Sequence, residues 1–185
     1  RHKLDSISDT VKNIDPEIRV ELHAEHLDSR NILGILANYD LLLDGSDNFP
    51  TRYLANDAAA IAGKPLVWGA ILRYHGQASV AWSGHGPTYR DLFPSPPAPG
   101  TVPSCADGGV LPSVCAVIGA IMCSETLKLI TGIGDPLIGT VTTYDALTGR
   151  FRDISFGTAE GTVPISELID YDAFCGAISD EAADA

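Results

Sequence analysis

Helical and strand-like patterns alternate along the first 82 residues, and this alternation limits the fold of the chain more than any other feature. Apolar residues at helical spacing predict a helix over residues 3–16, where a proline ends the pattern. Residues 18–27 alternate apolar and polar side chains, as a half-buried strand does. Residues 29–39 predict a short helix, and the apolar run 40–44 predicts another strand. Such alternation indicates an α/β domain with a largely parallel sheet.

The remaining patterns add further helices and strands to this domain. Residues 48–65 begin with capping side chains and a proline and end near a glycine, which predicts a helix. Residues 65–71 and 77–82 predict the next two strands. Residues 113–132 are apolar nearly all round, so we expect a buried helix there. Residues 139–156 predict a β-hairpin.

Composition limits the kinds of partner that the chain is expected to bind. The 185 residues have a hydrophobic fraction of 45%, which suits a single domain with a large core. The formal net charge is −12 and no basic run occurs, so we expect no nucleic-acid partner. No uninterrupted apolar run approaches the roughly 18 residues of a membrane helix, so we expect a cytoplasmic protein without a membrane partner.

Cysteine spacing predicts free thiols, because the four cysteines form no CxxC pair and no dense disulfide framework. Two of them, Cys115 and Cys123, lie in the apolar stretch 113–132, so we expect them in the core. Cys175 lies near the end of the chain, in a short stretch that is expected to be ordered.

Polar side chains crowd the end of the apolar run 40–44. Asp44, Asp47 and Asn48 follow this run, and Arg52 comes one helical turn later. In parallel sheets, ligands bind beyond the carboxyl ends of the strands. These side chains suit a turn and a helix cap, and they also suit Mg²⁺ with a phosphate that Arg52 meets. The pattern alone leaves both interpretations open.

Four stretches of the sequence carry a resemblance to a known family. They are "DLLLDGSDNFPTRYLANDAAAIAGKPLVWGAILRYHGQASVAW", "YRDLFP", "PSCADGGVLPSVCAVIGAIMCSETLKLITG" and "TVTTYDALTGRFRDI". They resemble the MoeB and ThiF family of adenylyltransferases, which activate ubiquitin-like sulfur carriers and are related to ubiquitin-activating enzymes. The likeness runs from Lys3 to Ile154 and looks closest to the MoeZ-like form with a C-terminal rhodanese domain.

The resemblance implies a fold and a domain organisation. It implies a Rossmann-like α/β fold, a sheet flanked by helices with a C-terminal β-hairpin, incomplete at its N-terminus. Residues 1–156 would be the C-terminal part of the adenylyltransferase domain. Residues 157–185 would be a linker or tail leading toward a rhodanese-like domain.

The resemblance also implies a reaction. The C-terminal glycine carboxylate of a ubiquitin-like sulfur carrier attacks the α-phosphate of ATP, with Mg²⁺ present, and pyrophosphate leaves. The adenylated carrier would then be prepared for thiocarboxylate formation in molybdopterin, thiamine or cysteine biosynthesis, and a homodimer is expected. Such a reaction needs positioning and neutralised phosphate charge more than covalent help.

The family's functional residues match several positions of this chain. Asp47 matches the aspartate that holds Mg-ATP, with Asn48 and Arg52 beside it. Lys3 matches a phosphate-contacting lysine, although a solvated charge at a helix end is an alternative. Arg73 matches an arginine near the channel for the carrier's tail, although a surface strand charge is equally compatible. For Asp44 the resemblance adds nothing, and we expect it to cap the end of the strand.

The family's functional cysteines match this chain at one place, Cys105, and are replaced at another. Cys105 matches the place where some members carry a reactive thiol for sulfur or thioester transfer, and a loop cysteine without a role is the alternative. Thr88 and Asp91 stand where many members have a zinc-binding CxxC pair, and no second pair follows. The sequence therefore predicts no structural zinc.

The family's glycine-rich phosphate loop would precede the position of Lys3 and is not among these residues. Such a loop supplies the backbone N–H donors for phosphate, so we expect no adenylation by the chain alone. Two alternatives remain: a non-catalytic fragment for dimerisation or carrier docking, and a Rossmann-type methyltransferase. The missing glycine loop and the long resemblance count against the methyltransferase.

Overall fold

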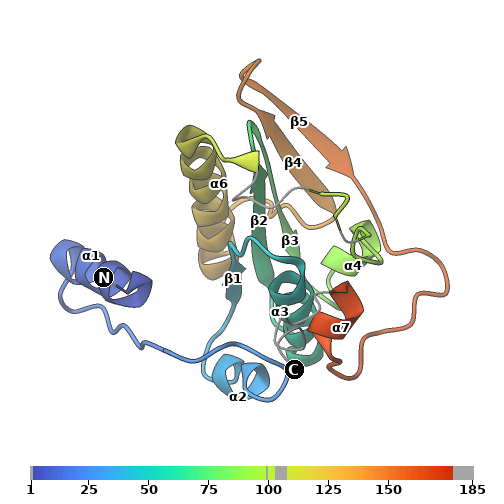
Figure 1. Ribbon diagram of the computed structural model, residues 1–185, viewed down its shortest axis with the longest axis horizontal. Helices are drawn as coiled ribbons and strands as arrows, with labels where there is room; N and C mark the ends of the chain where they lie inside the picture. The colour runs from blue at the N-terminus through green and yellow to red at the C-terminus, as the bar shows by residue number, and fades with distance from the viewer. Residues whose placement is uncertain (1, 99, 103–107, 177–185) are drawn as a thin grey trace, which may run out of the picture.

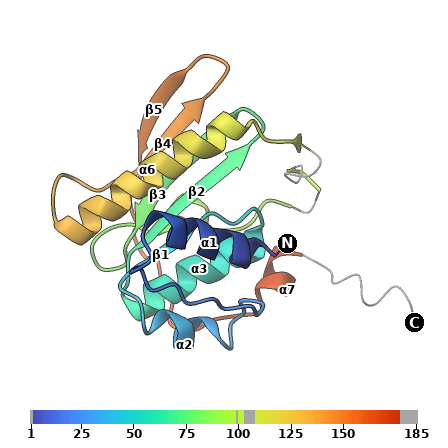
Figure 2. The same cartoon turned by 90° about the vertical axis from the view of Figure 1, so that its left-hand side faces the viewer.

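A five-stranded sheet forms the centre of the computed structural model, which describes residues 2–98, 100–102 and 108–176. Its strands stand in sequence order, and they are β1 (Leu42–Asp44), β2 (Leu66–Leu72), β3 (His75–Ala81), β4 (Thr140–Asp145) and β5 (Arg150–Ser155). Helix α6 (Pro112–Thr131) packs on one face of the sheet. Helices α3 (Phe49–Ala62), α4 (Tyr89–Leu92) and α7 (Tyr171–Cys175) lie on the other face (Figures 1 and 2).

The sheet is mixed rather than largely parallel. Strands β1 and β2 pair in parallel, whereas β2–β3, β3–β4 and β4–β5 are antiparallel. Only Arg73 and Tyr74 separate β2 from β3, and so short a connection can join only antiparallel neighbours. The α/β class and the hairpin over residues 139–156 are confirmed.

Helix α3 begins and ends where the sequence predicts. The side chain of its N-cap residue Asn48 accepts a hydrogen bond from the Thr51 N–H at 2.9 Å, and Pro50 occupies the first turn. Gly63 ends the helix with a left-handed φ of 65°, which favours glycine. These local signals fix the point at which the chain turns away from β1.

Helix α6 is buried on one face only. Val114, Ile118 and Met122 face β2 and β3, and a Cβ added to Gly76 of β3 would lie 2.4 Å from Ile118 Cγ1. The predicted burial of this helix therefore holds for one face only, because the sheet covers only that face. Cys115 and Cys123 are exposed on α6, so their expected place in the core was wrong.

By length and composition alone α6 is long and apolar enough to cross a membrane, although Glu125 and Lys128 interrupt its apolar run. Glu125 is buried, and its carboxylate accepts hydrogen bonds from Lys128 Nζ at 2.7 Å and from the Leu137 N–H at 2.8 Å. Buried helices of globular domains have the same composition. The packing of α6 on β2 and β3 accounts for the apolar residues of its buried face.

Residues 18–27 form no strand, in contrast to the sequence prediction. They follow α1 (Lys3–Ile14) and precede α2 (Ile32–Leu36), and within the described residues they pair with none of the five strands. An alternating pattern becomes a strand only when a neighbour satisfies its backbone groups. The two short helices themselves agree with the prediction.

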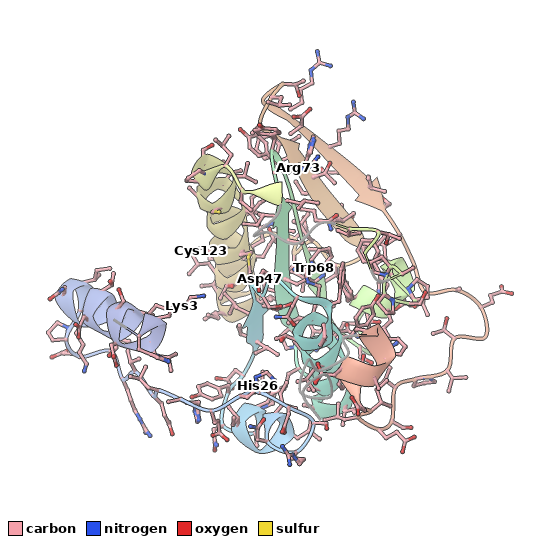
Figure 3. All side chains as sticks on the ribbon, in the orientation of Figure 1. Lys3, His26, Asp47, Trp68, Arg73 and Cys123 are labelled. Carbon is pink, nitrogen blue, oxygen red and sulfur yellow. The ribbon has the colours of Figure 1, made fainter. Side chains whose placement is uncertain are left out.

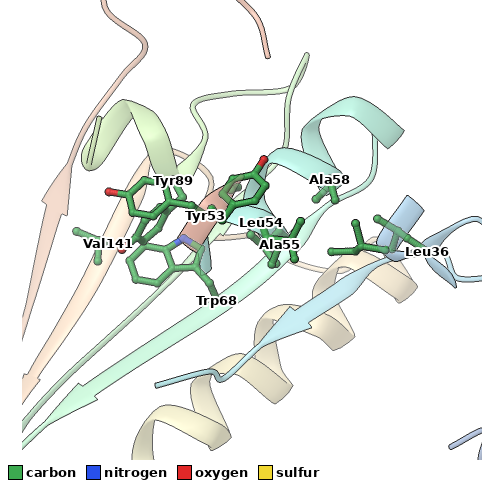
Figure 4. Packing of buried hydrophobic residues seen from close by; sticks show 13 residues of the cluster. Leu36, Tyr53, Leu54, Ala55, Ala58, Trp68, Tyr89 and Val141 are labelled. Atoms are coloured by element: carbon green, nitrogen blue, oxygen red, sulfur yellow. The ribbon is translucent and has the colours of Figure 1, made fainter. Parts of the chain in front are cut away.

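Aromatic rings form the centre of the larger core, between the sheet and α3 (Figure 4). Tyr89 packs edge-to-face against Trp68 and Tyr53, with ring centroids 5.1 and 5.4 Å apart. All three rings are buried. Edge-to-face pairs add about 0.5–1.5 kcal/mol each beyond the burial of their area. This cluster fixes α4 against α3 and so supports the loop at the end of β1.

Candidate functional site

The candidate site lies in the loop that follows β1. Asp44 ends the strand, is 5% exposed, and accepts a hydrogen bond from the Ser46 N–H at 2.8 Å through Oδ1. This local turn is the strand-end role that the sequence predicts for Asp44. Asp47 is exposed, and its carboxylate makes no hydrogen bond or ion pair with another described residue. Figure 3 shows Asp47 close to β1.

Arg52 points inward from α3 and braces the loop. Its Nη2 donates a hydrogen bond to the Ser46 carbonyl at 2.6 Å, and its Nε lies 3.9 Å from Asp44 Oδ2. The guanidinium also lies beside the buried Tyr89 hydroxyl; burial raises the pKa of Tyr89, and the positive charge of Arg52 partly opposes this. Arg52 therefore ties the loop to the aromatic core.

Several buried polar atoms in and beside this loop lack a hydrogen-bond partner among the described residues. Asp44 Oδ2, Ser46 Oγ and Arg52 Nε are buried, and none of them has a hydrogen-bond partner among the described residues. Most buried polar atoms in folded proteins have one. The 3.9 Å separation of the Asp44 and Arg52 atoms is too long for a hydrogen bond, so a small shift of the loop would bring them together.

Asn48 serves both interpretations of its position. Its side-chain oxygen is taken by the helix cap of α3, and its amide N–H groups point away from that bond. An amide N–H group is a donor that suits phosphate oxygens. The sequence left the cap and the ligand role open, and the structure shows that the cap is formed.

Arg73 lies farther along the sheet in the same direction. Asp44 pairs with Trp68, and Arg73 comes five positions later on the chain of β2, which places it about 16 Å beyond the level of Asp44. Its φ of 54° is in the left-handed region, which is uncommon for a residue other than glycine. Its N–H donates to the Gly109 carbonyl at 3.1 Å, and its carbonyl accepts from the Leu111 N–H at 2.9 Å.

These bonds attach the segment 108–111 to the turn between β2 and β3. A Cβ added to Gly108 would lie 3.5 Å from Arg73 Nε, an ordinary van der Waals distance, so this segment packs beside the guanidinium. Cys105 precedes this segment but falls outside the described residues, so its predicted role stays a prediction. Lys3 is exposed at the first position of α1, and Figure 3 shows it on a different element from Asp47 and Arg73.

The positions that match the family's zinc cysteines form a helix cap here. Thr88 and Asp91 form a capping box on α4, in which the Thr88 N–H donates to Asp91 Oδ2 at 2.6 Å. The Thr88 hydroxyl also donates to the same oxygen, at 3.0 Å. Across the parts of the chain that the structure describes, no group of three or more His, Cys, Asp or Glu side chains is arranged to hold a metal.

Sequence reasoning missed a second polar cluster, on the side of α3 that faces α4 and α7. Asp57 is 1% exposed, and its two oxygens accept hydrogen bonds from Arg90 Nε at 2.8 Å and Nη2 at 2.7 Å. They also accept from Asn56 Nδ2 at 2.9 Å and from the Tyr171 hydroxyl at 2.7 Å. The only local signal was the pair Asn56 and Asp57 within the otherwise apolar middle of α3.

Comparison with known proteins supplies a family and a fold. The ThiF family matches residues 1–163. A Mycobacterium tuberculosis protein named "Probable adenylyltransferase/sulfurtransferase MoeZ" is 51% identical over 189 residues, covering 100% of this chain and 48% of that protein. A Thermus thermophilus protein named "Sulfur carrier protein adenylyltransferase" is 49% identical over 177 residues, covering 90% of this chain and 65% of that protein. The chain thus spans about half the length of the first relative and about two thirds of the second.

Solved structures of Escherichia coli MccB share the fold. One of them, MccB with MccA-N7isoASN, has a TM-score of 0.73 at 14% identity and covers 91% of this chain and 52% of that chain. Another, MccB with ATP, has a TM-score of 0.68 at 16% identity, over 89% of this chain and 50% of that chain. The family match over most of the sequence, together with these relatives, shows that the chain belongs to the ThiF family.

Proposed function

We propose that the intact protein adenylates the C-terminal glycine of a ubiquitin-like sulfur carrier and so prepares it for thiocarboxylate formation. The observation that carries this proposal is the exposed Asp47 carboxylate, held after β1 by a loop that Arg52 braces, in a ThiF-family chain. The name of the Thermus thermophilus relative supports the sulfur carrier as substrate. Because the chain spans only part of its relatives, we assign the activity to the intact protein.

Asp47 is the residue that would hold Mg²⁺. Mg²⁺ is bound in proteins by one or two carboxylates together with phosphate oxygens and water, and Asp47 offers one carboxylate that pairs with no other described residue. The solved MccB complex with ATP supports nucleotide use by this fold. ATP would supply the α-phosphorus that the carrier's carboxylate attacks, and Mg²⁺ would neutralise phosphate charge.

The neighbours of Asp47 have distinct tasks in this proposal. Asn48 caps α3 with its oxygen and offers its amide N–H groups to the nucleotide. Arg52 keeps the loop in place through its bond to the Ser46 carbonyl, and a nucleotide bound at Asp47 would lie beside this loop. Lys3 would neutralise phosphate charge from α1. These residues orient the reactants and hold charge, as the reaction requires.

Arg73 is suited to orient the tail of the carrier. It lies about 16 Å beyond the level of Asp44 along the sheet, a distance that an extended tail of about five residues covers. Its guanidinium pairs well with a carboxylate or with peptide carbonyls. Cys105 precedes Pro112 of α6 by seven residues. Its thiol would take part in sulfur or thioester transfer to the adenylated tail of the carrier.

A homodimer is the assembly that we propose for the intact protein, in the cytoplasm. The exposed face of α6 has uncharged and mostly small side chains at a spacing of four residues, namely Cys115, Gly119, Cys123 and Leu127. Small residues allow close approach of a second helix. Sedimentation of the intact protein tests this assembly.

ATP–pyrophosphate exchange with the intact protein and its sulfur carrier tests the reaction. We expect Asp47→Asn to lower the exchange rate by about 10²–10³-fold, because it removes the charge that holds Mg²⁺. Asp40→Asn is the matched control, since Asp40 is exposed at the opposite end of β1. Unchanged exchange in Asp47→Asn would refute the site. Carrier binding without any exchange in the wild-type protein would favour a docking module instead.

A further inference from the structure

Helix α7 is docked on the domain although it lies beyond the part that the ThiF family matches. The family match ends at residue 163, and residues 157–167 are almost all exposed. The chain then returns to the surface of α3 and α4, where Tyr171 is only 5% exposed (Figure 1). A linker that makes no contact with the domain would leave this aromatic side chain exposed to water.

Two aromatic side chains of α7 enter one cradle. The Tyr171 hydroxyl donates to Asp57 Oδ2 at 2.7 Å, and Asp57 is fixed by the two hydrogen bonds from Arg90. The ring of Phe174 packs under the Arg90 guanidinium, 4.7 Å from Cζ to the ring centroid. It also meets the edge of Tyr53, with centroids 5.4 Å apart. The cradle thus consists of Tyr53, Asp57 and Arg90.

The contacts with the cradle, rather than helix propensity, hold α7 in place. The helix has five residues, from Tyr171 to Cys175, and a helix that short does not persist alone in water. Asp170 caps its start by accepting from the Ala173 N–H at 2.9 Å, and Gly176 ends it with a φ of 66°. Tyr171 and Phe174 are three residues apart, so both reach the same side of one helical turn.

We propose that α7 is an anchor: the cradle binds Tyr171 and Phe174 and fixes Gly176 as the point from which the chain continues. A free segment of about twenty residues after β5 would have a root-mean-square span of roughly 25 Å. The anchor removes this freedom and so raises the effective concentration, near the domain, of the residues that follow Gly176. This inference goes beyond the proposed reaction and requires neither ATP nor a carrier.

Cys175 gives the anchor a direct chemical readout. Its thiol is partly buried next to the cradle, and this burial, with a smaller contribution from the Asp172 carboxylate, raises its pKa to about 11. The thiolate is the reactive form, so release of α7 would bring the pKa back toward its ordinary range and speed alkylation. Cys115 and Cys123 on α6 are exposed and serve as references in the same molecule.

The test compares alkylation by iodoacetamide at pH 8 in the full chain and in Phe174→Ala, followed by peptide mass spectrometry. We expect the rate at Cys175, relative to Cys115 and Cys123, to rise at least ten-fold in the variant. Hydrogen exchange in residues 170–176 should quicken by a similar factor, while β2 and β3 keep their protection. Phe151→Ala is the matched control, because Phe151 is 53% exposed on β5.

Three results would overturn the anchor. One is a wild-type Cys175 that reacts as fast as the exposed Cys115, and another is an unchanged rate in Phe174→Ala. If Phe174→Ala also lowers the protection of β2 and β3, Tyr171→Phe decides, because it keeps the ring and removes only the bond to Asp57. Selective release of residues 170–176 in that variant supports the anchor, and an unchanged Cys175 rate is the third overturning result.

Discussion

Replacing Arg90 with methionine should destabilise the chain strongly, because it leaves the Asp57 carboxylate buried without a cation. Asp57 is almost fully buried, and Arg90 provides two of the four hydrogen bonds that its oxygens accept. Removing one partner of a buried ion pair costs about 3–5 kcal/mol. The Arg90 side chain is 20% exposed, so some water can replace it, and we expect about 3 kcal/mol. Asp57 also raises the pKa of Arg90, which agrees with a strong pair.

Urea unfolding of the full chain measures this loss as the change in the free energy of unfolding. The double variant Asp57→Asn with Arg90→Met removes the stranded charge, so it should be about 1–2 kcal/mol more stable than Arg90→Met alone. Arg19→Met is the matched control: Arg19 forms an exposed pair with Glu21, and its loss should change stability by less than about 0.5 kcal/mol. A loss below about 1 kcal/mol in Arg90→Met, or a double variant less stable than the single one, would refute the reasoning.

Two further predictions concern the cap of α3 and the buried phenols. Asn48→Ala should lower the free energy of unfolding by about 1 kcal/mol, whereas Asn48→Asp keeps the cap, and urea unfolding of both variants measures the difference. Stability should also fall as the pH rises above about 10, because burial raises the pKa of Tyr53 and Tyr171 above that ordinary value. The unfolded chain then loses its phenolic protons first, so the stabilisation is complete below pH 10 and is lost above it. Unfolding at pH 8, 10 and 11 tests this, and Tyr171→Phe should weaken the dependence.

Local signals predicted the elements whose ends depend on single residues. Asn48 and Gly63 act on their own backbone neighbours, so the bounds of α3 follow from the sequence. The strand expected over residues 18–27 failed for the opposite reason, since a strand depends on a partner elsewhere in the fold. Helix α6 shows a third case: an apolar composition does not tell which face a sheet will cover.

The candidate site was predicted in position but not in orientation. The run 40–44 and the polar residues after it placed Asp47 at the end of a strand, which the structure confirms. The inward direction of Arg52 depends on packing against Tyr89, a residue 37 positions later, and no periodicity encodes that. The bond between Asp57 and Tyr171 spans 114 positions and was equally out of reach.

Helix α3 supports both the candidate site and the anchor, but the polar groups at its middle have more hydrogen bonds than those near its N-terminus. Asp57 receives four hydrogen bonds, and Asn56 accepts one from the Tyr89 N–H at 2.9 Å, so the middle of α3 has a single well-determined geometry. Near its N-terminus, three of the five buried unpaired polar atoms among the described residues belong to Asp44, Ser46 and Arg52. A loop with unsatisfied buried groups gains by moving slightly when a ligand supplies partners. Ligand-induced change is therefore expected in the loop that carries Asp47, while the α3–α4 support stays fixed.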